Sequence, residues 1–143
     1  MDSNFQRVKT WMQEVGQPTP THPCRWSPEL LQLRRTLINE ECDEVLAVFE
    51  YMEVKTPNLV STDITLEMVK ELCDLLVVTY GALVSLGVDG DAAFRLVMEN
   101  NDGKIAHAQR REDGKTVVPA EIKVQLKEKM RRNLLNLLNL EAA

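Results

Sequence analysis

The sequence predicts an all-α fold, a four- to five-helix bundle, from three observations. Apolar residues recur three and four positions apart in long segments, as on the buried face of a helix. Aromatic residues make up only 5% of the chain, so Leu, Val, Ile, Met and Ala must form most of the core. No alternating strand pattern of useful length is present. A length of 143 residues is typical of a single core.

The first helix is predicted over residues 3–15, with Gly16 as its stop. A loop rich in proline follows and is expected to be extended. Ser27 and Pro28 then form a strong start signal, since serine caps helices and proline suits the first helical position. They begin a long helix predicted over 28–53.

The next connection, KTPNLVSTD, is predicted to be a loop, and Thr62 or Asp63 can cap the helix that follows. That helix, predicted over 64–86, is apolar on most of its circumference. It is therefore expected to be the most buried helix of the protein, ending at Gly87.

A further helix is predicted over 89–108, followed by a polar turn region, QRREDGKTVVP. Residues 119–143 form a final amphipathic helix, which is either part of the same unit as residues 1–118 or a subunit contact. Both readings stay open for its broad apolar surface. The leucines on that surface are Leu134, Leu135, Leu137, Leu138 and Leu140.

The composition argues against several classes of function. A net charge of −5 argues against a nucleic-acid coat or a binder of membrane surfaces, which usually present a basic face. Three cysteines without metal-site spacing are expected to be free thiols. The N-terminus has no apolar signal-like region, and no segment is long and apolar enough to span a membrane, so a cytoplasmic protein is expected.

Two helices carry acidic residues among apolar ones. Glu41 and Glu44 lie three positions apart on the first long helix, and Glu71 and Asp74 do so on the apolar helix. Four carboxylates gathered in a core repel one another unless a cation neutralises them. Oxygen ligands favour Mg²⁺, or Mn²⁺, over zinc. The alternative is a solvated acidic face in which Glu40, Glu41, Asp43 and Glu44 pair with Arg34 and Arg35.

NEECDE followed by KELCDLL resembles the EExxE…ExxD pattern of the all-α nucleoside triphosphate pyrophosphatase superfamily. That superfamily includes MazG-like proteins, dimeric dUTPases and phosphoribosyl-ATP pyrophosphohydrolases. The similarity is greatest to the single-domain MazG-like branch and extends over GQPTP, LRRTLINEECDEV, ELCDLLVVTYGALVSLGVDGDAAF and NNDGK. It implies a MazG-like domain over residues 1–118 that works as a homodimer or homotetramer.

The resemblance also implies roles for single residues. It makes Glu41, Glu44, Glu71 and Asp74 the metal ligands. It places Asn101 and Lys104 in the family's N-x-x-K segment, which contacts the triphosphate, and Arg34 within reach of a phosphate. Glu40 is a further group near the substrate, and Trp26 is a candidate for stacking on the base, although packing is the more common role of a tryptophan.

The chemistry that the resemblance implies is magnesium-dependent hydrolysis of a nucleoside triphosphate to the monophosphate and pyrophosphate, with a deoxynucleotide as the expected substrate. Glu41 or Glu44 deprotonates the attacking water, and the activity clears unwanted nucleotides from the pool. Two alternatives stay open: a dUTPase-type enzyme with a narrow pyrimidine preference, and a helical oligomer that binds a nucleotide or metal without catalysis. The sequence does not show which base is preferred.

Overall fold

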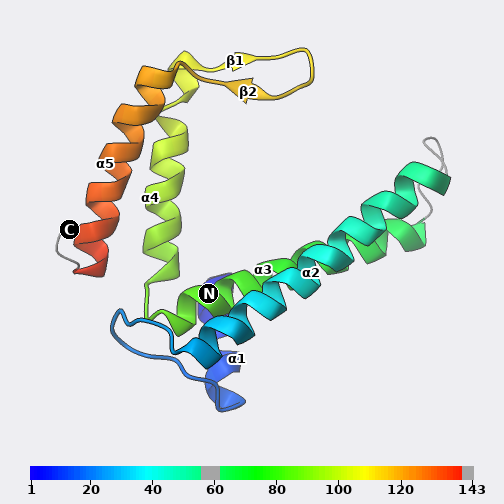
Figure 1. Ribbon diagram of the computed structural model, residues 1–143, viewed down its shortest axis with the longest axis vertical. Coiled ribbons are helices and arrows are strands. Elements are labelled where there is room, and N and C mark those ends of the chain that lie inside the picture. Colours follow the sequence, from blue (N-terminus) through cyan, green and yellow to red (C-terminus); the bar gives the residue numbers. More distant parts are fainter. Residues whose placement is uncertain (56–61, 140–143) are drawn as a thin grey trace. The chain divides into compact units, whose positions relative to one another are not determined.

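The computed structural model describes residues 1–55 and 62–139, and within these ranges it confirms the all-α class (Figure 1). The described chain holds five α-helices and one short hairpin. It divides into two compact units, Met1–Gly87 and Val88–Ala143. Most of the loop expected before the third helix, and Leu140 of the C-terminal leucine surface, lie outside the described residues.

The first unit contains α1 (Asn4–Glu14), α2 (Pro28–Lys55) and α3 (Thr62–Ser85). Serine caps begin the first two helices: the Ser3 hydroxyl accepts from the Gln6 amide at 3.1 Å, and the Ser27 hydroxyl accepts from the Leu30 amide at 3.2 Å. The start predicted at Ser27 and Pro28 is therefore confirmed. α3 begins two residues before its predicted start, so Thr62 and Asp63 lie inside the helix.

The hydrophobic core of this unit joins α1 to the C-terminal part of α3. Phe5, Met12 and Val84 are each at most 2% exposed and form one cluster. The Phe5 and Tyr80 rings meet edge to face with centroids 6.3 Å apart, a favourable aromatic geometry. Helix α1 thus holds only one end of α3.

Helices α2 and α3 run antiparallel along most of their length (Figure 1). At one end, Arg34 lies against Gly81, where a Cβ would be 3.0 Å from the Arg34 Nη1 atom. The absence of a side chain at Gly81 thus leaves room for this buried guanidinium. Seven residues after Arg34, Glu41 of α2 lies opposite Glu71 of α3.

The proline-rich loop returns to the end of α3. The Cys24 amide donates to the Leu86 carbonyl at 3.0 Å, and the Trp26 indole donates to the Ser85 hydroxyl at 2.9 Å. Gly87 ends the helix at φ +69°, in the left-handed region, and a Cβ there would overlap the His22 carbonyl. The C-terminal end of α3 is therefore fixed by the proline-rich loop, by Trp26 and by Gly87.

Among the described helices, α3 has the most buried residues, as expected, but part of its apolar surface is exposed. Val69, Leu72, Leu76 and Val77 are each more than 40% exposed. The reason is geometric: α2 and α1 cover only part of the circumference of α3, while its apolar residues lie all round it. Within the described ranges, no single helix is long and apolar enough to cross a membrane.

The second unit pairs α4 (Gly90–Asp102) with α5 (Ala120–Leu138). The helix predicted over 89–108 is too long by six residues at its C-terminal end, because α4 ends at Asp102 and the chain then forms a short 3₁₀ turn at Ile105–His107. Gly103 is also a close-packing position, since a Cβ there would be 2.7 Å from the Leu126 side chain of α5.

The polar segment predicted as a turn is a β-hairpin. Strand β1 (Gln109–Arg110) pairs antiparallel with β2 (Thr116–Val117), with Gly114 at φ +82° in the connection. Two-residue strands are too short to leave an alternating pattern in the sequence. The C-terminal helix is confirmed, and its described leucines, Leu134, Leu135, Leu137 and Leu138, are half-buried in the single chain.

Gly87→Ala should destabilise the protein by about 1–3 kcal/mol, because it adds backbone strain and an overlap with His22. Gly16→Ala is the matched control: Gly16 has φ +74°, but nothing lies within 4 Å of its added Cβ. Urea unfolding of both variants separates the two causes. Equal losses in free energy would show that the contact with the loop contributes nothing.

Candidate active site

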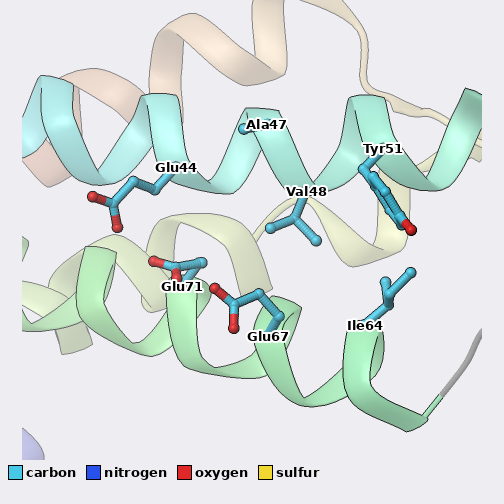
Figure 2. A pocket seen from close by; sticks show the side chains of 7 residues that line it. All are labelled: Glu44, Ala47, Val48, Tyr51, Ile64, Glu67 and Glu71. Atoms are coloured by element: carbon cyan, nitrogen blue, oxygen red, sulfur yellow. The ribbon is translucent and has the colours of Figure 1, made fainter.

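Three carboxylates from two helices meet in one place. Glu41 and Glu44 of α2 and Glu71 of α3 each offer an oxygen, and these atoms all lie within 4.8 Å of one another. Glu44 and Glu71 point toward each other from the facing helices (Figure 2). The i, i+3 spacing on α2 and the antiparallel pairing with α3 together produce this carboxylate group, Glu41, Glu44 and Glu71.

Two oxygens of the carboxylate group are buried without a hydrogen-bond partner among the described residues: Glu41 Oε2 and Glu71 Oε2. Glu71 is only 4% exposed, so water offers it little compensation. Leaving an anionic oxygen buried and unsatisfied is costly. Neighbouring ligands of Mg²⁺ lie roughly 3–4 Å apart, given bonds of about 2.1 Å, so these residues fit a divalent cation after small adjustments.

The pKa values of Glu44 and Glu71 are shifted in opposite directions. The pKa of Glu44 is raised, first by its hydrogen bond with Glu71 and then by the negative charges of Glu71 and Glu41. The pKa of Glu71 is lowered, chiefly because Lys70 donates a hydrogen bond to it, although burial opposes this. The neighbouring carboxylates therefore favour the neutral form of Glu44, while the Lys70 ammonium favours the charged form of Glu71.

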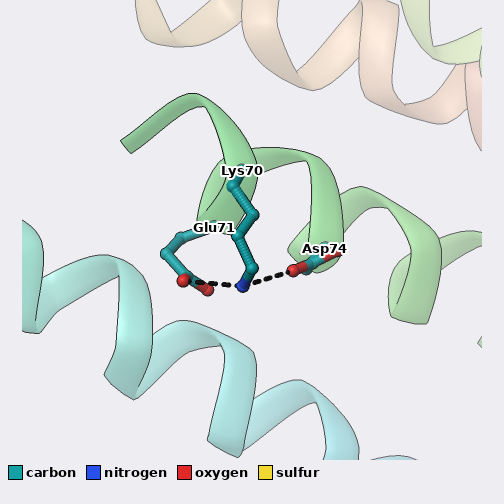
Figure 3. A network of polar contacts seen from close by, with 3 residues as sticks. All are labelled: Lys70, Glu71 and Asp74. Carbon is teal, nitrogen blue, oxygen red and sulfur yellow. Dashed lines mark hydrogen bonds and ion pairs between the residues drawn. The ribbon is translucent and has the colours of Figure 1, made fainter. Parts of the chain in front are cut away.

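Asp74, the fourth predicted ligand, lies outside the group. Its Oδ2 accepts from the Lys70 ammonium at 2.9 Å, and the same ammonium donates to Glu71 Oε1 at 2.8 Å (Figure 3). The structure thus brings three of the four predicted carboxylates together and pairs the fourth with a lysine.

A cavity of about 440 Å³ opens beside the carboxylates, between α2 and α3. Its lining combines acidic, aliphatic and aromatic side chains: Glu44, Ala47, Val48, Tyr51, Ile64, Glu67 and Glu71 (Figure 2). Tyr51 lies seven residues after Glu44 and Ile64 seven residues before Glu71. The cavity therefore extends roughly 10 Å from the acids along both helices.

The other predicted residues of the first unit lie apart from this cavity. Arg34 is 3% exposed, its Nη2 donates to Gln17 Oε1 at 3.1 Å, and its Nε is buried without a partner in the described chain. Glu40 is exposed. Trp26 binds Ser85, which is fourteen residues after Glu71 and so about 21 Å along α3 from the acids.

Asn101 and Lys104 belong to the second unit. The Lys104 ammonium donates to Asn101 Oδ1 at 2.9 Å, so the two residues of the N-x-x-K segment contact each other. Asn101 lies on the last turn of α4, and Lys104 follows Gly103, where the helix has ended.

Sequence reasoning missed three residues of the site: Tyr51, Glu67 and Lys70. The signals were present, since Tyr51 lies two helical turns from Glu44 and Lys70 stands four residues before Asp74. They carried little weight because lysines and tyrosines at such spacings are common on solvated helix faces.

Glu44→Gln should stabilise the metal-free protein at pH 7 and remove part of its pH dependence. A raised folded-state pKa contributes stability that is fully present below the ordinary value of about 4.3 and is lost as the pH rises through the folded pKa. Thermal melts in EDTA from pH 4 to pH 8 measure this. The variant should melt above the wild type at pH 7, and the gap should close toward pH 4. A gap independent of pH would contradict the assignment.

The carboxylate group lies in a segment that matches a known protein family. Residues 8–101, about two thirds of the chain, match the family described as phosphoribosyl-ATP pyrophosphohydrolase. The matched segment contains the whole carboxylate group and Asp74, and it ends at Asn101, before Lys104. No curated protein matches the chain. The chain therefore belongs to the phosphoribosyl-ATP pyrophosphohydrolase family of the MazG-like all-α superfamily, enzymes that hydrolyse phosphoanhydride bonds.

Proposed function

We propose that this protein hydrolyses a nucleoside triphosphate to the monophosphate and pyrophosphate with Mg²⁺, or Mn²⁺, as cofactor. The carboxylate group is the observation that carries the proposal, since it holds two buried oxygens that lack partners in the described chain. The chain also belongs to a family of pyrophosphohydrolases, which supports a phosphoanhydride bond as the bond that is cleaved.

Glu41, Glu44 and Glu71 are the proposed ligands of the cation, and Asp74 joins them when its oxygen is released by Lys70. A divalent cation at this place neutralises the acids and offsets the charge that develops on the phosphate oxygens. Glu41 or Glu44 accepts the proton of the attacking water. No covalent intermediate is required.

The cavity is the proposed binding site of the nucleoside. Its acidic end is formed by Glu44 and Glu71, and its far end by Tyr51 and Ile64. A volume of about 440 Å³ lies in the range typical of small-molecule sites. With the α-phosphate at the carboxylates, the ribose and base extend toward Tyr51, where the ring offers an aromatic face, and Glu67 offers an acceptor for an amino group.

The remaining phosphates need cationic or amide partners, and Arg34, Asn101 and Lys104 are the proposed ones, as the family pattern implies. We also propose that the active form is a homo-oligomer, a dimer or tetramer. The support is the apolar face that α3 leaves exposed on the described chain, which includes Leu66, Val69, Leu72, Leu76 and Val77.

A second candidate substrate is phosphoribosyl-ATP itself, because it gives the matched family its name. It too would lose pyrophosphate from a triphosphate chain, so the same residues would act in the same roles. The two candidates differ only in what occupies the cavity beyond the α-phosphate.

The purified protein should release pyrophosphate from at least one compound in a panel of the common NTPs and dNTPs, dUTP and phosphoribosyl-ATP, and only with a divalent cation. Glu71→Ala should lower that rate by about 10²-fold or more, because it removes the most buried carboxylate of the group. Products are quantified as monophosphate and pyrophosphate.

Asp43→Asn is the matched control for this assay. Asp43 is an exposed acid of α2 that lies outside the carboxylate group, and its loss should change the rate less than twofold. Cleavage of phosphoribosyl-ATP alone would select the second candidate. Absence of hydrolysis with every compound and metal would leave a nucleotide- or metal-binding oligomer.

Tyr51→Ala should raise KM for the preferred nucleotide by about tenfold while changing kcat much less, because the ring contacts the nucleoside and not the reacting phosphate. Tyr51→Phe should keep most of the affinity. Phe49→Ala provides the control, since Phe49 is an exposed aromatic residue of α2 that does not line the cavity. A loss confined to kcat would contradict this position for the base.

A further inference from the structure

Lys70 is the cation that the described chain itself places against the acidic site. Its ammonium donates to Glu71 Oε1 at 2.8 Å and to Asp74 Oδ2 at 2.9 Å (Figure 3). Both acceptors are ligands in the proposed metal site. The other oxygen of Glu71, Oε2, is the buried one without a partner in the described ranges. One oxygen of this carboxylate is thus held by the lysine, and the other is left without a partner in the described chain.

The position of Lys70 along α3 explains how one ammonium reaches both acids. Asp74 is four residues further on and lies on the same stripe of the helix, whereas Glu71 is the next residue and lies about 100° round it. The long lysine side chain must bend across the helix to bridge them. The bridge draws Asp74 toward the ammonium, and Asp74 is the one predicted ligand that stays outside the carboxylate group.

The exposures of the three side chains show which partner can move. The Lys70 side chain is 58% exposed, against 5% for Glu71 and 42% for Asp74. Exposed ion pairs of lysine contribute little to stability because water competes for the charges and the flexible side chain loses entropy. The ammonium can therefore leave without disturbing the packing of α3, while Glu71 cannot.

We propose that Lys70 is a tethered counter-cation of this site, which holds Glu71 and Asp74 when no divalent cation is bound and is displaced when one binds. The inference rests on the proposed function, since it assumes a divalent cation at these acids. Displacement frees Asp74 Oδ2 and Glu71 Oε1 at the same time. The released ammonium stays attached one residue from Glu71, next to the place where the triphosphate lies.

Lys70 then has a second partner of opposite charge within reach, the substrate phosphates. A lysine binds phosphate as a mobile point charge, which suits a side chain that changes partners. The proposal therefore gives one residue two opposite effects: it weakens metal binding in the absence of nucleotide and strengthens nucleotide binding in its presence. A lysine with a purely structural role would not produce effects of opposite sign.

The test begins with calorimetric titration of Mg²⁺ and Mn²⁺ into metal-free full-length protein without nucleotide. Lys70→Gln should bind both ions about threefold to tenfold more tightly than the wild type, since no ammonium competes for the acids. Lys70→Arg, which keeps a charged donor, should bind them like the wild type. Lys9→Gln removes one positive charge from α1 and should leave both affinities unchanged.

The same variants are then assayed with the preferred nucleotide at saturating metal. Lys70→Gln should raise KM several-fold although its metal affinity is higher. In the wild type, Mg²⁺ should also speed acetylation of Lys70, measured by mass spectrometry, and this readout does not depend on how the variants fold.

The outcomes separate the two proposals. A wild type that binds neither ion contradicts the proposed function. A wild type that binds them, with a Lys70→Gln variant that binds them equally or less tightly, overturns the role of Lys70 and leaves the metal site intact. Unchanged acetylation of Lys70 on adding Mg²⁺ would also overturn it.

Discussion

Negative charge is crowded between α2 and α3, and the repulsion that results shapes the local contacts of the candidate site. Three carboxylates share a space in which their oxygens lie within 4.8 Å of one another, and two of those oxygens lack partners among the described residues. The raised pKa of Glu44 and the recruitment of Lys70 by Glu71 are both responses to this repulsion. A sequence that keeps such an arrangement in a folded protein gives up stability for a function, which is usual at binding and catalytic sites.

The acids stay together because the helices are locked elsewhere. Phe5 and Met12 of α1 pack on the C-terminal part of α3, and Arg34 of α2 lies in the space that Gly81 leaves. The Trp26–Ser85 hydrogen bond ties the proline-rich loop to the same end. Toward their other ends, α2 and α3 enclose the open cavity instead of a filled core. The pair is therefore rigid on one side of the carboxylates and accessible on the other, as a site for a substrate of some length requires.

Helix α3 serves three purposes, and its residues divide accordingly. One part joins the core, one part supplies Glu71 and Asp74, and an apolar face remains exposed on the described chain. This division explains why the helix is apolar almost all round and yet is partly exposed. The exposed valines and leucines alternate along α3 with the residues of the site. A subunit that covered this apolar face would therefore lie close to the site. Family membership identifies the kind of bond that is cleaved, a phosphoanhydride.

The all-α class, the start of α2, the two acidic pairs and the family could be predicted from the sequence, because they follow from local spacing, capping and motif. Helical periodicity shows that Glu41 and Glu44 share a face, whatever packs against it. The end of α4 at Gly103 and the hairpin were less accessible, since glycine occurs within helices and two-residue strands leave no pattern. Helical spacing could not predict that Glu71 meets Glu41 and Glu44, that Arg34 is buried against Gly81 or that Trp26 binds Ser85. These contacts depend on the antiparallel alignment of α2 with α3 and on side-chain conformations within it, and neither is encoded in the spacing along a single helix.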